Sequence, residues 1–112
     1  MYTNADVRQK FRQGISGIEN QSGSMETTEL PNGNLGLVGY GHALYAERNA
    51  TGEITVYQGW TEWANNQSFN AEATPRHIRA VTEFADRVED RNPSLKAPPE
   101  SIAEIGRMGR NR

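Results

Sequence analysis

The sequence holds few side chains suited to metal or redox chemistry. It has no cysteine and two histidines, His42 and His77. The lack of cysteine excludes disulfides, thiol catalysis, iron–sulfur clusters and cysteine zinc sites. A site of two histidines and one carboxylate, from Glu47 or Glu72, can be drawn. Because no spacing supports it, we expect neither a bound metal nor a cofactor.

The sequence likewise contains no clear motif for acid–base or nucleophilic catalysis. Glu47, Glu53 and Glu62 are the carboxylates from which a hydrolase pair could be built, but carboxylates on strands and loops are usually just solvated. Ser68 lies near His77 in the sequence, yet nothing indicates a strained nucleophile turn or an oxyanion site. The glycines follow no phosphate-binding spacing. We therefore expect a protein that is not an enzyme.

Aromatic residues gather in the middle of the chain and suggest a binding surface. They are Tyr40, Tyr45, Tyr57, Trp60, Trp63 and Phe69. Aromatic side chains on a sheet face can stack nucleic-acid bases, and Tyr, Trp and Arg dominate the contacts between proteins. Ordinary core packing is the third interpretation. The predicted binding residues are Tyr45, Glu47, Arg48, Tyr57, Trp60 and Trp63.

Composition narrows the class of protein. The 112 residues amount to one domain, and 35% of them are hydrophobic. The formal net charge of -2 argues against a general nucleic-acid coating protein, which needs a large positive excess. The apolar runs are too short to span a bilayer, and the first residues lack a secretory signal pattern. We expect a soluble, cytoplasmic protein with no membrane partner.

The N-terminal segment predicts an amphipathic helix. Thr3 or Asn4 can cap it, and Gly14 can end it. Val7, Phe11 and Ile15 recur at four-residue spacing and form a narrow apolar stripe. We expect this stripe to pack on a sheet.

Two β-hairpins are predicted next. Residues 25–30 and 35–40 flank the Pro-Asn-Gly-Asn turn at 31–34, whose Asn and Gly tolerate positive φ. Residues 42–48 and 53–58 form the second hairpin, with Ala46 opposite Val56. The two faces of this hairpin follow by alternation. Leu44, Ala46, Arg48, Ile54, Val56 and Gln58 would face the core, and Tyr45, Glu47, Thr55 and Tyr57 would face solvent or a partner.

The last part of the chain predicts one strong helix and one weak helix. Thr74 can cap the strong helix, Pro75 suits its first position, and Asn92-Pro93 stops it. Its apolar stripe would run from Ile78 through Val81 and Phe84 to Val88. We expect residues 94–98 to form a linker and residues 99–108 to form a weak helix, which a basic tail follows.

These elements predict an α+β fold. It consists of a four-stranded antiparallel meander with an N-terminal helix, a main helix packed on one sheet face and a weak C-terminal helix. Residues 1–93 form the domain, and residues 94–112 form a linker, a short helix and a flexible basic tail.

Several short motifs carry a likeness to a known group of proteins. They are Leu37-Val38-Gly39-Tyr40-Gly41, Ala43-Leu44-Tyr45-Ala46, a turn with Gly52, the strand Ile54-Thr55-Val56 and the helix start Thr74-Pro75-Arg76-His77-Ile78. From Leu37 to Val81 the chain resembles small uncharacterised proteins of phages, archaeal viruses and plasmids. It departs from them at Ala73, where a threonine is common, and in a longer segment from Trp63 to Phe69. The resemblance implies a mobile genetic element and no particular mechanism.

Three functions follow as hypotheses. The first is a small non-enzymatic binding protein that inhibits or redirects a host protein complex, with a nucleic-acid-targeting defence system such as CRISPR as one candidate, which would make it an anti-CRISPR protein. The second is a single-stranded nucleic-acid-binding protein that uses an aromatic sheet face. The third is a structural or self-assembling virion component. The oligomeric state stays open.

Overall fold

The computed structural model describes residues 2–61 and 73–95. Trp63, most of the aromatic segment before the main helix, and the weak helix predicted at 99–108 lie outside the described residues.

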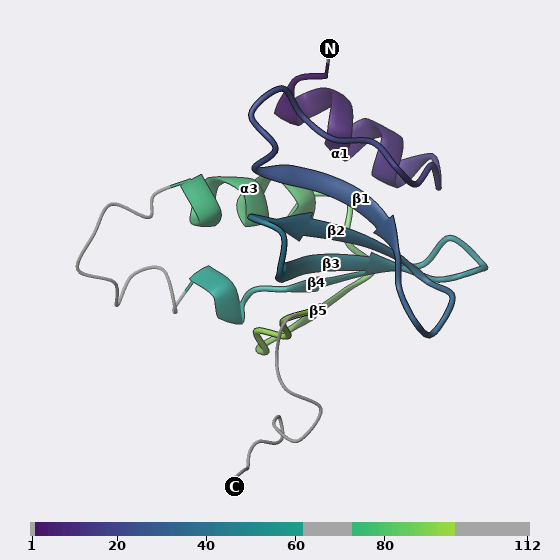
Figure 1. The fold of residues 1–112 in the computed structure, drawn as a ribbon. Coiled ribbons are helices and arrows are strands. Elements are labelled where there is room, and N and C mark those ends of the chain that lie inside the picture. The colour runs from purple at the N-terminus through teal and green to yellow at the C-terminus, as the bar shows by residue number, and fades with distance from the viewer. Residues whose placement is uncertain (1, 62–72, 96–112) are drawn as a thin grey trace, which may run out of the picture.

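The described chain forms an α+β domain, as predicted, built on one open five-stranded sheet (Figure 1). The strands are β1 (Met25–Glu29), β2 (Leu35–Gly39), β3 (Ala43–Arg48), β4 (Ile54–Tyr57) and β5 (Arg87–Glu89). Their order in the sheet is β1-β2-β3-β4-β5. The first four pair antiparallel, which confirms the predicted meander, and β5 pairs parallel to β4.

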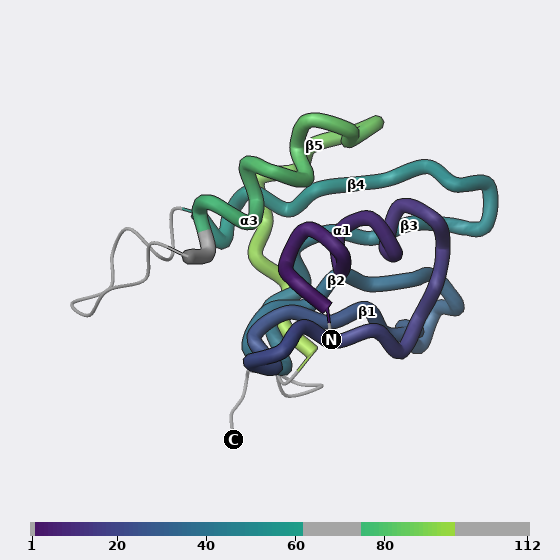
Figure 2. The backbone as a smooth tube through the Cα atoms, turned by 90° about the horizontal axis from the view of Figure 1, so that it is seen from above, coloured from purple at the N-terminus to yellow at the C-terminus, as the bar shows by residue number. Residues whose placement is uncertain are grey.

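The N-terminal helix and the main helix lie on the same side of the sheet. Helix α1 (Asn4–Arg12) packs on β1 and β2, and helix α3 (Ala73–Thr82) packs on β3 and β4 (Figures 1 and 2). We call this side the helical face and the opposite side the lower face. Strand β5 forms the edge of the sheet beside β4 (Figure 1).

Helix α1 begins and ends as its sequence predicts. Thr3 Oγ1 accepts a hydrogen bond from the Asp6 backbone N–H, and Asp6 accepts one from the Thr3 N–H, so a complete capping box starts the helix. Val7 and Phe11 are buried against the sheet. Ile15 lies beyond the helix and is exposed, so the predicted stripe is two residues long.

A β-bulge in β3 changes which side chains share a face. Leu37 pairs with Ala46, but the next residue, Val38, pairs with Leu44, so Tyr45 is an extra residue in β3. A bulge of this kind shifts the alternation by one residue. The register of Ala46 opposite Val56 is confirmed. The prediction that Leu44 and Ala46 share a face is wrong, because the bulge lies between them.

The main helix is shorter than predicted. It ends at Thr82, where the next bonds run from Phe84 N–H to Val81 C=O and from Ala85 N–H to Thr82 C=O. The chain then forms β5, which the periodicity had assigned to the helix. Strand β4 is buried along its whole length, and its backbone needs bonding partners on both sides. Strand β5 supplies them on the side away from β3.

A close approach of two segments requires glycine at position 59. A Cβ at Gly59 would lie 2.3 Å from the carbonyl oxygen of Arg91. The chain after β5 therefore crosses directly over the end of β4. It continues to Ser94, which forms an isolated antiparallel bridge with Ala43. Leu95 N–H donates a 2.7 Å hydrogen bond to His42 C=O, which holds this segment on the start of β3.

Candidate functional site

Tyr45 lies in the core, so the prediction that it faces solvent or a partner is wrong. Its exposed fraction is 0%. The bulge places its ring over Gly39, where a Cβ would lie 2.1 Å from the Tyr45 hydroxyl oxygen. The ring centroid lies 6.0 Å from that of His77 on α3. Tyr45 therefore fills the space between the sheet and α3.

Trp60 is also buried, with an exposed fraction of 4%, which corrects the expectation of a contact residue. Its indole Nε1–H donates a 2.9 Å hydrogen bond to the Pro93 carbonyl. The His42 ring meets it edge-on at 5.6 Å between centroids, and His42 Nδ1 lies 3.1 Å from Ser94 Oγ. Trp60 and His42 thus lock the segment 93–95 onto the sheet, and their polar atoms are used in that contact.

Arg48 lies apart from the predicted tyrosine surface. Its Nε–H donates a 3.2 Å hydrogen bond to the Arg12 carbonyl near the end of α1. Its guanidinium fits against Gly14 and Gly52, where added Cβ atoms would lie 2.8 Å and 3.4 Å from it. A cation at the C-terminal end of a helix also complements the helix dipole. Arg48 therefore joins α1 to the second hairpin on the helical face.

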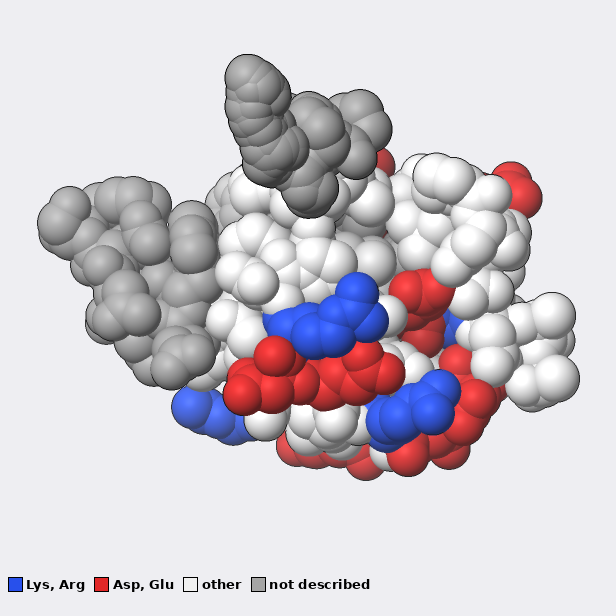
Figure 3. All heavy atoms as spheres, turned by 90° about the horizontal axis from the view of Figure 1, so that it is seen from below, with Lys and Arg blue, Asp and Glu red and all other residues white. Residues whose placement is uncertain are grey.

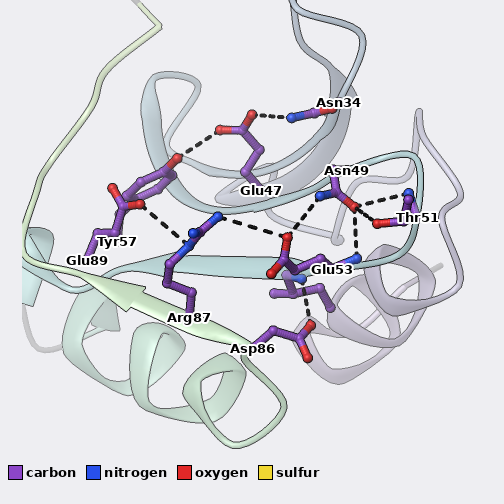
Figure 4. Close-up of polar contacts among 10 residues, drawn as sticks. Asn34, Glu47, Asn49, Thr51, Glu53, Tyr57, Asp86, Arg87 and Glu89 are labelled. Carbon is purple, nitrogen blue, oxygen red and sulfur yellow. Dashed lines mark hydrogen bonds and ion pairs between the residues drawn. The ribbon is translucent and has the colours of Figure 1, made fainter.

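Glu47 and Tyr57 are brought together on the lower face, as the predicted register requires. The Tyr57 hydroxyl donates a 2.9 Å hydrogen bond to Glu47 Oε1. Glu47 Oε2 accepts two more, from Asn34 Nδ2 at 2.6 Å and from Asn32 Nδ2 at 2.8 Å. Figure 4 shows the Tyr57 and Asn34 side chains converging on this carboxylate. Tyr57 is only 7% exposed, so its ring is not available as a flat contact surface.

The surroundings shift the pKa values of both groups. Burial raises the pKa of Glu47, but the hydrogen bonds from Asn32, Asn34 and Tyr57 lower it further, so the pKa lies below its ordinary value. Burial, the bond to Glu47 and the charge of that carboxylate together raise the pKa of Tyr57 to about 12. The pair is thus a carboxylate and a neutral phenol at neutral pH.

Charged side chains surround Tyr57 and form one connected surface. The Arg91 guanidinium lies 5.3 Å from the Tyr57 ring centroid, and its Nη1 lies 3.0 Å from Glu89 Oε1. Arg87 lies between Glu89, 3.8 Å away, and Glu53, 3.9 Å away. Figure 3 shows acidic and basic groups alternating on this side. We call Glu47, Glu53, Arg87, Glu89 and Arg91 the charged face.

The predicted binding residues include Glu47 of the charged face and miss its other four members, Glu53, Arg87, Glu89 and Arg91. The sequence pattern places Arg87, Glu89 and Arg91 in the main helix, because Val88 completes its apolar stripe. The three-residue alternation Arg87-Val88-Glu89 is compatible with a strand, but it is too short to outweigh the helical spacing that reaches Val88. Asn32 and Asn34 were assigned to a turn, which is correct, but their side chains also bind Glu47.

Neither histidine is placed for metal binding in the part of the chain that is described. Across residues 2–61 and 73–95, no group of three His, Asp or Glu residues converges on a point where a metal ion could sit. His77 is buried beside Tyr45, and burial lowers its pKa, as do the charges of Arg8 and Arg76. Glu72 and Ser68 lie outside the described residues.

A shallow groove opens beside α3. Its volume is about 560 Å³, and its described lining includes Ile78, Arg79 and Thr82 of α3 together with Gln58 and Asp90. It offers one guanidinium and one carboxylate among amide, hydroxyl and aliphatic groups. Such a lining is not specific for one ligand class.

The fold and site define a small α+β domain whose open sheet presents a charged face. No family model, curated protein or solved structure is significantly similar to the chain. Among the described residues, no helix is long and apolar enough to cross a bilayer.

Proposed function

We propose that this protein is a small non-enzymatic binding protein whose charged face contacts another protein. The observation that carries the proposal is the arrangement around Tyr57. Two arginines with side chains 58% and 63% exposed, Arg87 and Arg91, are held by the carboxylates of Glu53 and Glu89. Arg residues pre-positioned beside an aromatic ring are typical of the residues that dominate protein interfaces.

The chemistry of this face favours a protein partner over nucleic acid. Three carboxylates, Glu47, Glu53 and Glu89, stand against two guanidinium groups, and a phosphate backbone would be repelled by this excess. The aromatic platform expected for base stacking is missing from the described part of the sheet, since Tyr45 and Tyr57 are buried. The partner surface that fits best is one of mixed charge with an excess of lysine and arginine.

The proposal also includes a biological setting, a protein of a mobile genetic element that acts on its host. The resemblance from Leu37 to Val81 supports a mobile genetic element, and proteins of this size from such elements often bind a host complex and block it. We propose a host protein complex as the partner, with a nucleic-acid-targeting defence system as one candidate. Nucleic-acid binding and virion assembly are the alternative proposals.

The proposal is tested by comparing what the wild-type protein and two charge reversals retain from host lysate. Arg91→Glu inverts the most exposed charge of the charged face. Arg79→Glu is the matched control, since it makes the same change at an exposed position on α3. We expect a protein that the wild type and Arg79→Glu retain, and whose affinity Arg91→Glu reduces by tenfold or more, about 1.4 kcal/mol.

Purified components then distinguish the alternatives. A partner that binds all three proteins equally would place the interface elsewhere and contradict the proposal. Binding of a labelled single-stranded oligonucleotide that weakens steeply with salt would favour the nucleic-acid alternative. Circular dichroism of both variants shows whether the fold is retained.

A further inference from the structure

The outer edge of the sheet leaves one residue of β5 with its backbone directed away from β4. The register pairs Arg87 with Thr55, Val88 with Val56 and Glu89 with Tyr57, and Gln58 N–H donates a 3.0 Å hydrogen bond to Glu89 C=O. Along a parallel strand, alternate residues direct both backbone groups to the same neighbour. Arg87 and Glu89 therefore face β4, and Val88 directs its N–H and C=O outward.

The outward side of β5 is open among the residues that the structure describes. No hydrogen bond from residues 2–61 or 73–95 reaches the Val88 backbone from that side. The Val88 side chain is 42% exposed. Figure 2 shows β5 at the margin of the molecule, remote from the other edge of the sheet at β1. Strand β1 differs, because residues 17–20 bond to its outer side through Thr27 and Met25.

The charges along β5 are complementary to those of a second copy of β5 that runs antiparallel to it. Arg87 and Glu89 flank Val88, so the strand reads positive, apolar, negative. A second copy running antiparallel reads negative, apolar, positive. With Val88 opposite Val88 of the other copy, each Arg87 faces a Glu89, and opposite charges across a strand pair are favourable.

We propose that a second copy of this chain docks on this edge, pairing the two β5 strands antiparallel about a two-fold axis at Val88. The two Val88 residues exchange both backbone hydrogen bonds, and two Arg87–Glu89 pairs close the contact on either side. The result is a continuous sheet across both copies with an isologous interface. This proposal does not depend on the proposed function.

The same charges select against other strands. Charged residues on an edge strand discourage pairing with foreign strands, and an apolar or single-charge strand would bring no opposite charge across the strand pair to Arg87 or Glu89. The contact is short, because an extended pairing would place Asp86 opposite Asp90. Asp86 is instead bonded to β4, where its Oδ2 accepts a 2.8 Å hydrogen bond from Ile54 N–H. We therefore expect a weak, concentration-dependent dimer.

Sedimentation equilibrium of the full chain at low salt, over a wide concentration range, tests this proposal. Arg87→Glu gives two negative residues on the edge, and Glu89→Arg gives two positive ones. Each variant alone should associate at least about tenfold more weakly than the wild type, because like charges then face each other. An equimolar mixture of the two should form a heterodimer, since every charge again faces its opposite.

Val88→Pro provides a test that leaves the charges unchanged. Proline removes the outward N–H, and it takes no bond from β4 because the Val88 N–H makes none there. We expect this variant to be monomeric and folded. Arg87 and Glu89 belong to both surfaces, whereas Arg91 belongs to the charged face alone, so Arg91→Glu should still dimerise and this distinguishes self-association from partner binding.

Three results would each overturn the proposal. The first is a wild-type protein that stays monomeric at every concentration. The second is self-association that neither charge variant weakens. The third is a mixture of the two variants that associates no better than each alone. Each of these results leaves partner binding by the charged face to be judged separately.

Discussion

The Tyr57 hydroxyl of β4 donates a 2.9 Å hydrogen bond to Glu47 Oε1 of β3. This bond connects two predicted binding residues, and it makes them an internal support for the charged face. Asn32 and Asn34 bind the second carboxylate oxygen from the turn between β1 and β2. One carboxylate thus joins β3, β4 and the turn between β1 and β2.

Glu47→Gln should destabilise the fold at neutral pH by about 1 kcal/mol, because a charged acceptor of three hydrogen bonds is lost. The pKa of Glu47 in the fold is lowered from its ordinary value of 4.5. Its contribution to stability is therefore complete above about pH 4.5 and is lost as the pH falls through the folded pKa. Urea unfolding of both proteins should give free energies that converge on acidification. Parallel curves, or an equal effect in the control Glu29→Gln at an exposed position, would contradict this role.

Tyr57→Phe should remove a phenol that ionises only at high pH. The pKa of Tyr57 is raised from 10.0 to about 12, so its contribution to stability is complete below pH 10 and is lost as the pH rises toward 12. Titration by tyrosinate absorbance should show a group near 12 in the wild type that is absent from the variant. If the two titrations instead differ by a group that ionises near 10, the bond to Glu47 is not formed.

Gly39→Ala should be one of the most damaging single changes. The added methyl would lie 2.1 Å from the Tyr45 hydroxyl oxygen and 2.2 Å from its ring carbon Cζ. The enclosed ring has no free space to move into, so we expect a loss of about 3 kcal/mol in the free energy of unfolding. Gly36→Ala is the matched control on the same strand, where the methyl meets the flexible ends of Leu30 and Leu44. An equal cost at both positions would show that Tyr45 is not fixed over Gly39.

Trp60→Phe should release the segment that crosses the end of β4. The change keeps an aromatic ring beside His42 but removes the donor to the Pro93 carbonyl, at a cost of about 1 kcal/mol. Amide hydrogen exchange should become faster at Leu95 N–H, which bonds to His42 C=O, and at Leu44 N–H, which bonds to Pro93 C=O. Unchanged protection at these two amides would mean that Trp60 does not hold the segment.

Local sequence determined the parts of the fold that depend on neighbouring residues. Thr3 and Asp6 start α1, the Pro-Asn-Gly-Asn turn joins β1 to β2, and Ala46 pairs with Val56. Caps, turns and hairpin registers follow from bonds within a few residues. The shared face of Glu47 and Tyr57 follows from the same register, and for this reason the sequence predicted the pair that the structure brings together.

Tertiary structure decided the bulge at Tyr45, the end of α3 at Thr82 and the burial of Tyr45, Tyr57 and Trp60. The apolar spacing that reaches Val88 is compatible with a longer helix. The backbone of the buried strand β4 nevertheless requires hydrogen-bonding partners, and residues 87–89 provide them as β5 instead of extending α3. The bulge turns Tyr45 into the space left by Gly39, and the crossing segment covers Trp60. Such competition between distant segments for the same backbone groups and the same space leaves no mark in local spacing. The sequence alone therefore specified the hairpins, and packing specified which side chains remain on the surface.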